Sequence, residues 1–359
     1  MTHCSVSPCN VAVVGAGIAG ATCAQALREA GHAVRMFDKS RGPGGRLATR
    51  RALWVDALGQ ARTTRFDHGA PGFDARSPAF RRFTAEALKA GWLAAWAPAE
   101  DRRGLALEGH GPFLLPVPDM PALCRQLLQG TGTSWASPVA ALQQGPSGWR
   151  LQGAHALLGE GFDAVVLALP PAQAGALLAD HHRSWARHAA LALMQPCWTL
   201  MGVAPAPAVA LAWEIARPPT GPLAWVQRND SRPGRERRAG EVHWVLHARA
   251  AWSRLHLEQP ADWVQAQLQT GLSEWLGESV HWSHAVTHCW RYAMPQASTA
   301  APSGDSWWDA ALGLGVCGDF LGGGGVEGAW LSARALAAAM AGTPSAHASD
   351  SQAAVPAEA

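Results

Sequence analysis

The chain of 359 residues is long enough for two domains, and its net charge of +2 gives no strong field of the kind that attracts nucleic acid. Its seven cysteines are dispersed without metal-ligand spacing, which favours reduced thiols in a cytoplasm. There is no apolar run of membrane-spanning length and no basic region ahead of an apolar one, so we expect a cytoplasmic protein without nucleic-acid or membrane partners.

The first forty residues predict a strand, a helix and a second strand in succession. The apolar run at 11–14 is typical of a strand buried on both faces, and residues 21–30 are good helix formers closed by Gly31. A second strand at 33–37 follows and ends at Asp38. This order is the beginning of a Rossmann unit.

Glycines between the first strand and the helix have the G-x-G-x-x-G spacing of a dinucleotide-binding turn. Gly15 permits the tight turn, Gly17 lets a pyrophosphate approach the backbone, and Gly20 lets the helix lie close to the strand. The helix N-terminus, with Ile18 and Ala19, then faces the phosphates with free N–H groups. Asp38 is placed to accept hydrogen bonds from the adenosine ribose.

The segment after Asp38 indicates which dinucleotide is bound. Lys39 is followed by the sequence RGPGGR at 41–46, in which Gly44, Gly45 and Arg46 would lay backbone and a cation on the same pyrophosphate. This element resembles the GGR motif of the flavin-dependent amine oxidase superfamily. The alternative is a solvated basic turn. Further on, the sequence FDHGA, with Asp67, His68, Gly69 and Ala70, would pass the flavin ring or form an ordinary turn.

The middle of the chain returns to the Rossmann unit and then changes character. We expect helices at 80–95 and from about Asp119, and strands at 133–139, 149–151 and 162–170. From about 180 to 290 tryptophans recur, and apolar stretches at 197–203, 223–227 and 242–247 predict strands, with a helix at 260–276. The polar loop at 229–238 contains Arg232, Arg235, Arg237 and Arg238, which would either attract phosphates or remain solvated.

Three histidines and a cysteine near residue 285 resemble a metal site only if the segment is helical. On a helix His281, His284 and His288 would share a face, whereas the even positions from Val280 to Tyr292 alternate as in a strand. We therefore predict a strand and no metal. The chain continues with a strand at 312–316, a glycine-rich turn and a helix at 329–341; we expect a disordered tail at 343–359.

The closest family resemblance is to the renalases and their bacterial relatives, within the flavin amine oxidase superfamily. It is carried by KSRGPGGRLATRR at 39–51, FDHGA at 66–70, NDSRPGRE at 229–236, WVLHARAAWSRLHLE at 244–258, WRYAMP at 290–295 and CGDFLGGGGVEGAWLSA at 317–333. The resemblance implies that Asp319 binds the ribityl chain and that Gly325, Val326 and Glu327 face the pyrimidine end of the flavin, with Val139 as a further FAD contact. Asp38, where a glutamate is expected, and Pro71–Gly72 depart from the family pattern.

The predicted fold class is α/β, with a discontinuous Rossmann-like FAD-binding domain of the amine oxidase type and an α+β mixed-sheet substrate domain. We assign 1–75, 131–178 and 285–342 to the FAD-binding domain, and 76–130 and 179–284 to the substrate domain. The FAD is expected to be non-covalent, because Cys317 reads as a buried strand residue.

The resemblance implies an oxidase that takes a hydride from dihydro-NAD(P) isomers to flavin N5 and is reoxidised by O2 to hydrogen peroxide. Losing the hydride makes the nicotinamide aromatic, so no catalytic base is needed. The expected pocket residues are Trp225, His247, Trp290 and Tyr292, each of which is otherwise an ordinary core or surface residue.

Two other functions remain open. One is an oxidase of amines or other small molecules, which the absence of any lysine after Lys89 disfavours, since many amine oxidases place a lysine near flavin N5. The other is a catalytically silent FAD-fold binding protein similar to the Rab escort proteins, which the intact glycine and Gly-Asp motifs disfavour.

Overall fold

The computed structural model describes residues 8–107, 111–207, 209–296 and 305–342. The chain forms two compact units. The first consists of Met1–Gly45, Cys124–Ala192 and Ser298–Ala359, and the second of Arg46–Leu123 and Leu193–Ala297. The boundaries predicted from the sequence differ in both directions. Residues 46–75 and 285–297, predicted in the FAD-binding domain, belong to the second unit, and 124–130 and 179–192, predicted in the substrate domain, belong to the first. The tail expected at 343–359 lies outside the described residues.

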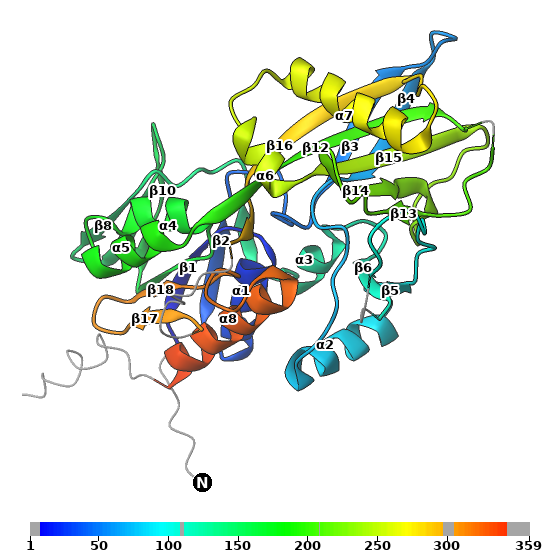
Figure 1. Ribbon diagram of the computed structural model, residues 1–359. Helices are drawn as coiled ribbons and strands as arrows, with labels where there is room; N and C mark the ends of the chain where they lie inside the picture. The colour runs from blue at the N-terminus through cyan, green and yellow to red at the C-terminus, as the bar shows by residue number, and fades with distance from the viewer. Residues whose placement is uncertain (1–7, 108–110, 208, 297–304, 343–359) are drawn as a thin grey trace, which may run out of the picture. The chain divides into compact units, whose positions relative to one another are not determined.

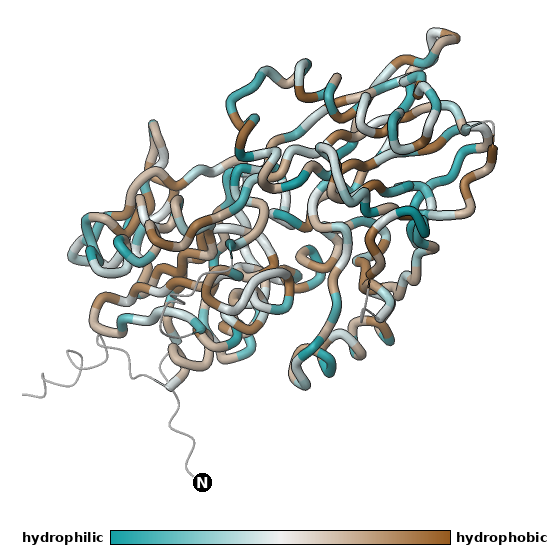
Figure 2. The backbone as a smooth tube through the Cα atoms, in the orientation of Figure 1, coloured by the Kyte–Doolittle hydropathy of each residue, from teal (hydrophilic) through white to brown (hydrophobic). Residues whose placement is uncertain are grey.

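The first unit is built on a six-stranded sheet. Its order is β17 (Trp307–Asp309), β18 (Leu314–Val316), β11 (Ala164–Leu167), β1 (Asn10–Val14), β2 (Ala33–Phe37) and β7 (Gly132–Ser134). Neighbouring strands are parallel except β17, which is antiparallel to β18. Strands from three separate stretches of sequence therefore pair, as the discontinuous-domain prediction requires, and hydrophobic segments run through the central strands (Figure 2).

Helices cover this sheet. Helix α1 (Ile18–Glu29) packs against α8 (Gly325–Ala341) (Figure 1). Leu336 of α8 lies against Gly315 of β18, so closely that a Cβ atom added to Gly315 would be 3.0 Å from the Leu336 side chain. A three-stranded antiparallel sheet also packs against the six-stranded sheet, and its Phe162 ring lies edge-on to Phe37 of β2, with the ring centroids 5.8 Å apart. The three strands of that sheet are β8 (Ala141–Gly145), β9 (Gly148–Gln152) and β10 (Leu157–Phe162). The remaining helices are α4 (Pro171–Leu178), α5 (Arg183–Leu191) and α3 (Ala122–Leu127), which precedes β7.

The second unit is built on a five-stranded antiparallel sheet. Its order is β13 (Ile215–Ala216), β14 (Leu223–Arg228), β15 (Glu241–Ala248), β12 (Met194–Pro205) and β16 (His284–Pro295). One parallel bridge, Glu100 to Ile215, adds to the β13 edge. Because side chains alternate along each strand, each face of this sheet collects its own set of residues.

The two faces are covered by different elements. One face packs against α7 (Ala261–Leu276) through a core that includes Trp198, Leu246 and Leu268. The other packs against the hairpin of β3 (Thr49–Val55) and β4 (Ala61–Asp67), whose Trp54 and Phe66 join Met201, Val203 and Val245. The other elements are α2 (Pro78–Lys89), β5 (Leu93–Trp96), β6 (Phe113–Pro116), η1 (Asn229–Ser231) and α6 (Ala250–Leu255).

Several expected elements differ from the structure. The strand expected at 133–139 is β7, which ends at Ser134, and the strand expected at 162–170 is divided between the end of β10 and β11. The helix expected at 80–95 ends at Lys89, because Gly91 adopts a positive φ of 72°, and the chain continues as β5 paired with β6. Trp96 therefore lies in a strand, not one helical turn from Trp92. Helix α8 begins at Gly325 instead of 329, so the glycine-rich turn itself supplies its first residues.

Candidate functional site

The turn between β1 and α1 requires glycine at two of its three glycine positions. Gly15 has a φ of 104°, and a Cβ there would lie 2.4 Å from the carbonyl oxygen of Ala168. A Cβ on Gly20 would lie 1.8 Å from the carbonyl oxygen of Gly15. These contacts are shorter than any real Cβ approach, so both glycines serve the close packing of helix, turn and strand.

Gly17 differs from the other two because a Cβ there would meet only an ordinary van der Waals contact. The nearest atom to a Cβ on Gly17 would be the Cα of Gly45, at 3.9 Å. Gly17 is also the N-cap of α1, no side chain caps that end, and its first turn contains no acidic residue. Backbone N–H groups and a partial positive charge are therefore presented at this helix end, the arrangement that binds phosphate groups in proteins. Ile18 and Ala19 lie in this first turn.

The second glycine pair packs directly on the first turn. The N–H of Gly44 donates to the carbonyl of Ala16 at 2.9 Å, and Gly44 bridges to Gly17. Gly44 and Gly45 both have positive φ, 125° and 57°. The two glycine turns predicted to share one pyrophosphate are thus neighbours in the first unit, and Arg46 directly follows them in sequence.

The Asp38 carboxylate is bound to the backbone of the turn. One oxygen accepts the N–H of Ala16 at 2.6 Å and the other accepts the N–H of Ser40 at 2.6 Å. A carboxylate can accept about four hydrogen bonds, so capacity remains for ribose hydroxyls. Lys39 is exposed, and Val139 is half-buried in the segment after β7, where Ser137 donates its N–H to the Asp38 carbonyl at 2.8 Å.

The turn before α8 also fits a cofactor. Asp319 is 3% exposed and follows Cys317, which is fully buried as expected. A Cβ on Gly322 would meet the Gly328 carbonyl oxygen at 2.0 Å, so the turn folds tightly onto the helix. The N-terminus of α8 has no side-chain cap, and Val326 and Glu327 lie in its first turn. A buried carboxylate beside an uncapped helix end matches the donor and acceptor pattern of a flavin and its ribityl chain.

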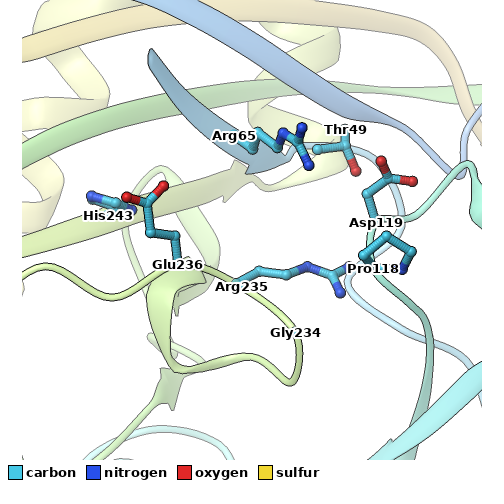
Figure 3. A pocket seen from close by; sticks show the side chains of 8 residues that line it. All are labelled: Thr49, Arg65, Pro118, Asp119, Gly234, Arg235, Glu236 and His243. Atoms are coloured by element: carbon cyan, nitrogen blue, oxygen red, sulfur yellow. The ribbon is translucent and has the colours of Figure 1, made fainter. Parts of the chain in front are cut away.

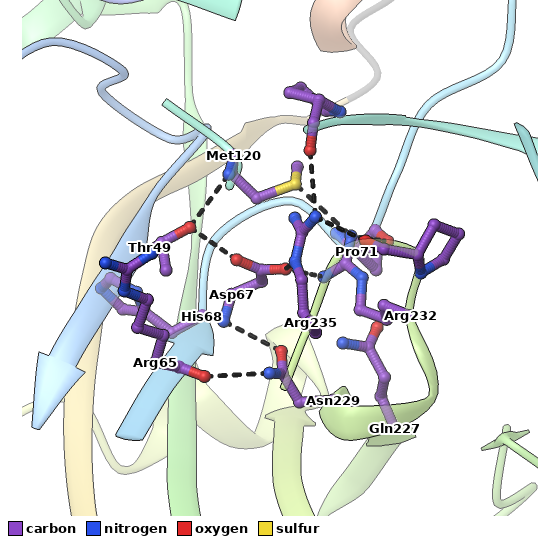
Figure 4. Close-up of polar contacts among 12 residues, drawn as sticks. Thr49, Arg65, Asp67, His68, Pro71, Met120, Gln227, Asn229, Arg232 and Arg235 are labelled. Carbon is purple, nitrogen blue, oxygen red and sulfur yellow. Dashed lines mark hydrogen bonds and ion pairs between the residues drawn. The ribbon is translucent and has the colours of Figure 1, made fainter. Parts of the chain in front are cut away.

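In the second unit, Asp67 is the centre of a buried ion-pair network (Figure 4). Its carboxylate contacts the guanidinium of Arg235 at 2.7 Å and that of Arg232 at 3.1 Å, and it accepts the Thr49 hydroxyl at 2.5 Å. Burial alone would raise the pKa of Asp67, but the two arginines and Thr49 hold it below its usual range. Asp67 thus uses its side chain for structure.

The loop containing the four arginines is not uniformly solvated. The side chain of Arg232 is fully buried and that of Arg235 is 5% exposed, whereas Arg237 pairs with Glu214, and Arg238 with Glu236, near the surface. The expectation of a solvated loop is therefore wrong for the first two. Burial lowers the pKa of Arg232 to about 10, although Asp67 opposes this shift. No local pattern could have paired these residues with Asp67.

Asn229 is a further member of this network that sequence reasoning missed. It is 1% exposed, accepts the backbone N–H of Asp67 at 3.0 Å and donates to the carbonyl of Arg65 at 3.0 Å. It therefore fixes the end of β4 to the start of η1. The position of His68, the next residue along, depends on this anchor.

A cluster of imidazoles and an indole lies on the face of the sheet that also bears Trp225. The Trp290 ring lies 5.0 Å from His68 and 4.5 Å from His288, and His68 and His288 are 5.1 Å apart, measured between ring centroids. The Trp290 Nε1–H donates to the His68 carbonyl at 2.9 Å, and His247 Nε2 lies 3.3 Å from the same oxygen. One carbonyl therefore ties His247 and Trp290 together.

Strand register explains why these residues share a face. Trp225 pairs with His247, His247 with Thr199, and Thr199 with His288, so the four side chains form a row across β14, β15, β12 and β16. Trp225 also donates its Nε1–H to Gln227 at 3.2 Å and packs on Phe113. Tyr292 is half-buried in β16, and among the described residues it has no ring contact with the cluster.

The histidines of the cluster are neutral near pH 7. Burial, then the charges of His288, Arg50 and His247, lower the pKa of His68 to about 3. Burial lowers the pKa of His247 to about 4. Burial and Arg50 lower the pKa of His288. The cluster therefore offers polar but uncharged rings to anything bound there.

A cavity of about 130 Å³ lies near the ion-pair network (Figure 3). Thr49, Arg65, Asp119, Glu236 and His243 line it together with Pro118, Gly234 and Arg235. Both signs of charge are present in the lining, so the cavity does not select an ion of one sign.

The described residues contain neither a cluster of metal ligands nor a helix that could cross a membrane. Within 8–107, 111–207, 209–296 and 305–342, no three His, Cys, Asp or Glu side chains gather as metal ligands. Across the same ranges, helices fall short of the length and apolarity that crossing a bilayer takes. The strand predicted for the histidine segment is confirmed as β16, which begins at His284 and so excludes Val280, His281 and Trp282.

Comparisons with known proteins agree with this architecture. Residues 13–87 match the model of an NAD(P)-binding Rossmann-like domain. A candidate protoporphyrinogen oxidase from Exiguobacterium sp. 255-15 has a TM-score of 0.66 at 12% identity, covering 94% of this chain and 99% of that one. Cyclohexylamine oxidase from Brevibacterium oxydans has a TM-score of 0.55 at 14% identity, covering 93% and 99%. A putrescine oxidase redesigned for cofactor binding has a TM-score of 0.58 at 14% identity, covering 93% and 98%.

These likenesses define the class of fold. The protein has the mixed α/β fold of amine-oxidase-type FAD-binding structures, with a Rossmann-like domain assembled from separate stretches of the chain. The fold class predicted from the sequence is confirmed.

Proposed function

We propose that the protein is a renalase-like, FAD-dependent oxidase of dihydro-NAD(P) isomers. The observation that carries the proposal is the uncharged cluster of His68, His247, His288 and Trp290. With pKa values of about 3 and about 4, His68 and His247 are poor proton acceptors near pH 7. Such a cluster suits a substrate that loses a hydride and needs no base.

FAD is the proposed cofactor, held without a covalent bond. The residues for it are the two glycine turns, Asp38, Asp319 and the N-terminus of α8, with Lys39, Arg46, Val139 and the backbone of 67–70 as further candidates. When bound, FAD would supply the hydride acceptor at N5 and the reaction with O2 that yields hydrogen peroxide. The fully buried Cys317 supports non-covalent binding.

The roles of the chain's own residues are binding and alignment. Trp290 offers a flat face for a nicotinamide ring, and Tyr292 is a further candidate on the same strand. Trp225, which was also expected in the pocket, is buried three strands away in a core with Trp96, Leu115 and Ile215 and packs there. The neutral imidazoles of His68 and His247 contribute hydrogen bonds without a charge that would oppose the positive ring of the product. The cytoplasm remains the expected location.

Amine oxidation is the second candidate, and the names of two of the structural neighbours favour it. Against it, Lys39 and Lys89 are the only lysines of the chain, and neither belongs to the five-stranded sheet.

A catalytically silent FAD-fold binding protein is the third candidate. The uncapped N-terminus of α1 at Gly17 disfavours it, since a protein without a cofactor gains nothing from unsatisfied N–H groups there.

Substrate panels separate the three functions. The FAD-loaded protein is assayed for hydrogen peroxide with dihydro-NAD(P) isomers and with primary, secondary and cyclic amines. Peroxide from the dinucleotides alone is expected; peroxide from amines alone would replace the proposal with amine oxidation. Failure to retain FAD at all would favour the binding protein.

A further inference from the structure

Arg50 occupies an inward position on β3. Side chains of a strand alternate between its faces, and Ala52 and Trp54 are 6% and 7% exposed in the core beneath the hairpin. Arg50 shares their face and is half-buried, whereas Arg51 points the other way and is exposed. A cation therefore lies between the hairpin and the sheet.

Histidines of β16 face this arginine. Trp54 stacks on His284 with ring centroids 5.9 Å apart, and Val286 packs into the same core as Ala52. Continuing along both strands brings Arg50 toward His288, which lies against His68. Three imidazoles and one guanidinium thus gather from β3, β16 and the end of β4.

No negative charge balances this group within the described residues. The side chain of Arg50 has neither an ion pair nor a hydrogen bond there, and its charge lowers the pKa of His68, His284 and His288. His247 is the other titratable group that faces the cluster, and the nearby Asp67 carboxylate is committed to Arg232 and Arg235.

Hydrogen-bonding capacity is also unused at this place. His68 Nδ1 and His284 Nε2 are buried and have no hydrogen-bond partner among the described residues. Buried polar atoms are nearly always satisfied, and a half-buried cation without a counter-charge is costly. Both deficits disappear if an oxyanion binds beside them.

We propose that Arg50, His68, His284 and His288 form an oxyanion-binding site that takes a phosphate group of the substrate. The inference rests on the proposed function, which supplies a dinucleotide as the molecule bearing the phosphate. Arg50 provides the charge and a forked pair of donors, and the imidazoles provide further hydrogen bonds. Trp290, next to His68 and His288, would then contact the organic part of the same molecule.

Proton uptake is the signature of such a site. The imidazoles are neutral in the free protein, and a bound anion favours the charged forms of His284 and His288, whereas His68, with a pKa lowered to about 3, stays neutral in this pH range. Binding should therefore take up protons, and affinity should rise as pH falls from about 8 to about 6. Inorganic pyrophosphate also titrates in this pH range, so the protons taken up by the imidazoles are those that His288→Gln removes relative to the unmodified protein.

The test uses inorganic pyrophosphate and the FAD-loaded protein in isothermal titration calorimetry, at about pH 6 and about pH 8 in buffers of different ionisation enthalpy. Arg50→Gln should weaken binding about tenfold or more, because a hydrogen bond to a charged group is lost. Arg51→Gln, one residue away on the exposed face, is the matched control and should stay within about twofold. His288→Gln should reduce the number of protons taken up.

Equal affinities for Arg50→Gln and Arg51→Gln would overturn the proposal. Arg50→Lys keeps the charge and should lose less than Arg50→Gln; a lysine variant that binds no better than the glutamine variant would contradict the electrostatic argument. Since neither arginine belongs to the glycine turns of the first unit, anion binding at those turns cannot produce a difference between the variants.

Substrate kinetics identify the phosphate. If the bridging diphosphate binds here, Arg50→Gln should raise KM equally for NAD-type and NADP-type substrates; an effect on the NADP-type alone would assign the site to the ribose phosphate. Pyrophosphate binding that depends on Arg50 without dihydro-NAD(P) oxidation would refute the proposed function and leave the anion site standing. Oxidation of dihydro-NAD(P), with pyrophosphate binding that does not depend on Arg50, would support the proposed function and refute the anion site.

Discussion

Replacing Asp67 with asparagine preserves the shape of the side chain but removes the charge that Arg232 and Arg235 share. The three side chains are 1%, 0% and 5% exposed, so water cannot replace the lost carboxylate. Breaking a buried ion pair from one side costs about 3–5 kcal/mol, because an uncompensated charge stays behind. Against a typical stability of roughly 5–15 kcal/mol, this is a large fraction.

The measurement is urea unfolding of Asp67→Asn, followed by tryptophan fluorescence and circular dichroism. The chain has 18 tryptophans, so their fluorescence follows global unfolding; one of them, Trp96, lies beside the network, with the Arg232 guanidinium 5.5 Å from its ring centroid. Glu258→Gln is the control, because Glu258 pairs with Arg291 on the exposed surface, and no measurable shift is expected. A loss below about 1 kcal/mol for Asp67→Asn would refute the view that the network is desolvated.

Three further predictions concern pH, cofactor and thiols. Burial lowers the pKa of His68 to about 3 and that of His247 to about 4, from 6.5 in the unfolded chain, so the unfolded chain binds protons first as pH falls. The free energy of unfolding should therefore drop by ~2 kcal/mol per histidine between about pH 6.5 and pH 5. If replacing both histidines with asparagine left the pH dependence of stability unchanged, this explanation would be wrong. Gly17→Ala should fold normally yet bind FAD at least about tenfold more weakly, whereas Gly20→Ala should lower the melting temperature, because a Cβ on Gly20 would meet the Gly15 carbonyl oxygen. Two variants with the same FAD affinity and the same melting temperature would contradict these contacts. Burial raises the pKa of Cys197 to about 12, so iodoacetamide should leave this thiol unmodified near pH 7 until the protein unfolds, as peptide mass spectrometry can check.

Local patterns sufficed for the elements that bind the predicted cofactor. The apolar run of β1, the spaced glycines and the helix formers of α1 act within a few residues of one another, so their consequences are visible in the sequence. The alternation that placed His284 and His288 on one strand face is equally local. Gly91 ended α2 early because a single positive φ overrode a helical pattern.

Long-range pairing could not be predicted in the same way. Arg235 reaches Asp67 across 168 residues, and the loop that carries it, NDSRPGRERR, is rich in charge, which indicates solvent when taken alone. The proximity of Arg50 to His288 likewise depends on how a hairpin packs on a sheet, which alternation within either strand does not determine.

Anaerobic rapid mixing tests the central claim most directly. The FAD-loaded protein is mixed with dihydro-NAD(P) isomers without O2, and the visible absorbance of the flavin is followed. The account predicts rapid bleaching by at least one isomer, and recovery with formation of NAD(P)+ and hydrogen peroxide when air is admitted. A flavin that every isomer leaves unbleached, while an amine bleaches it, would contradict the account.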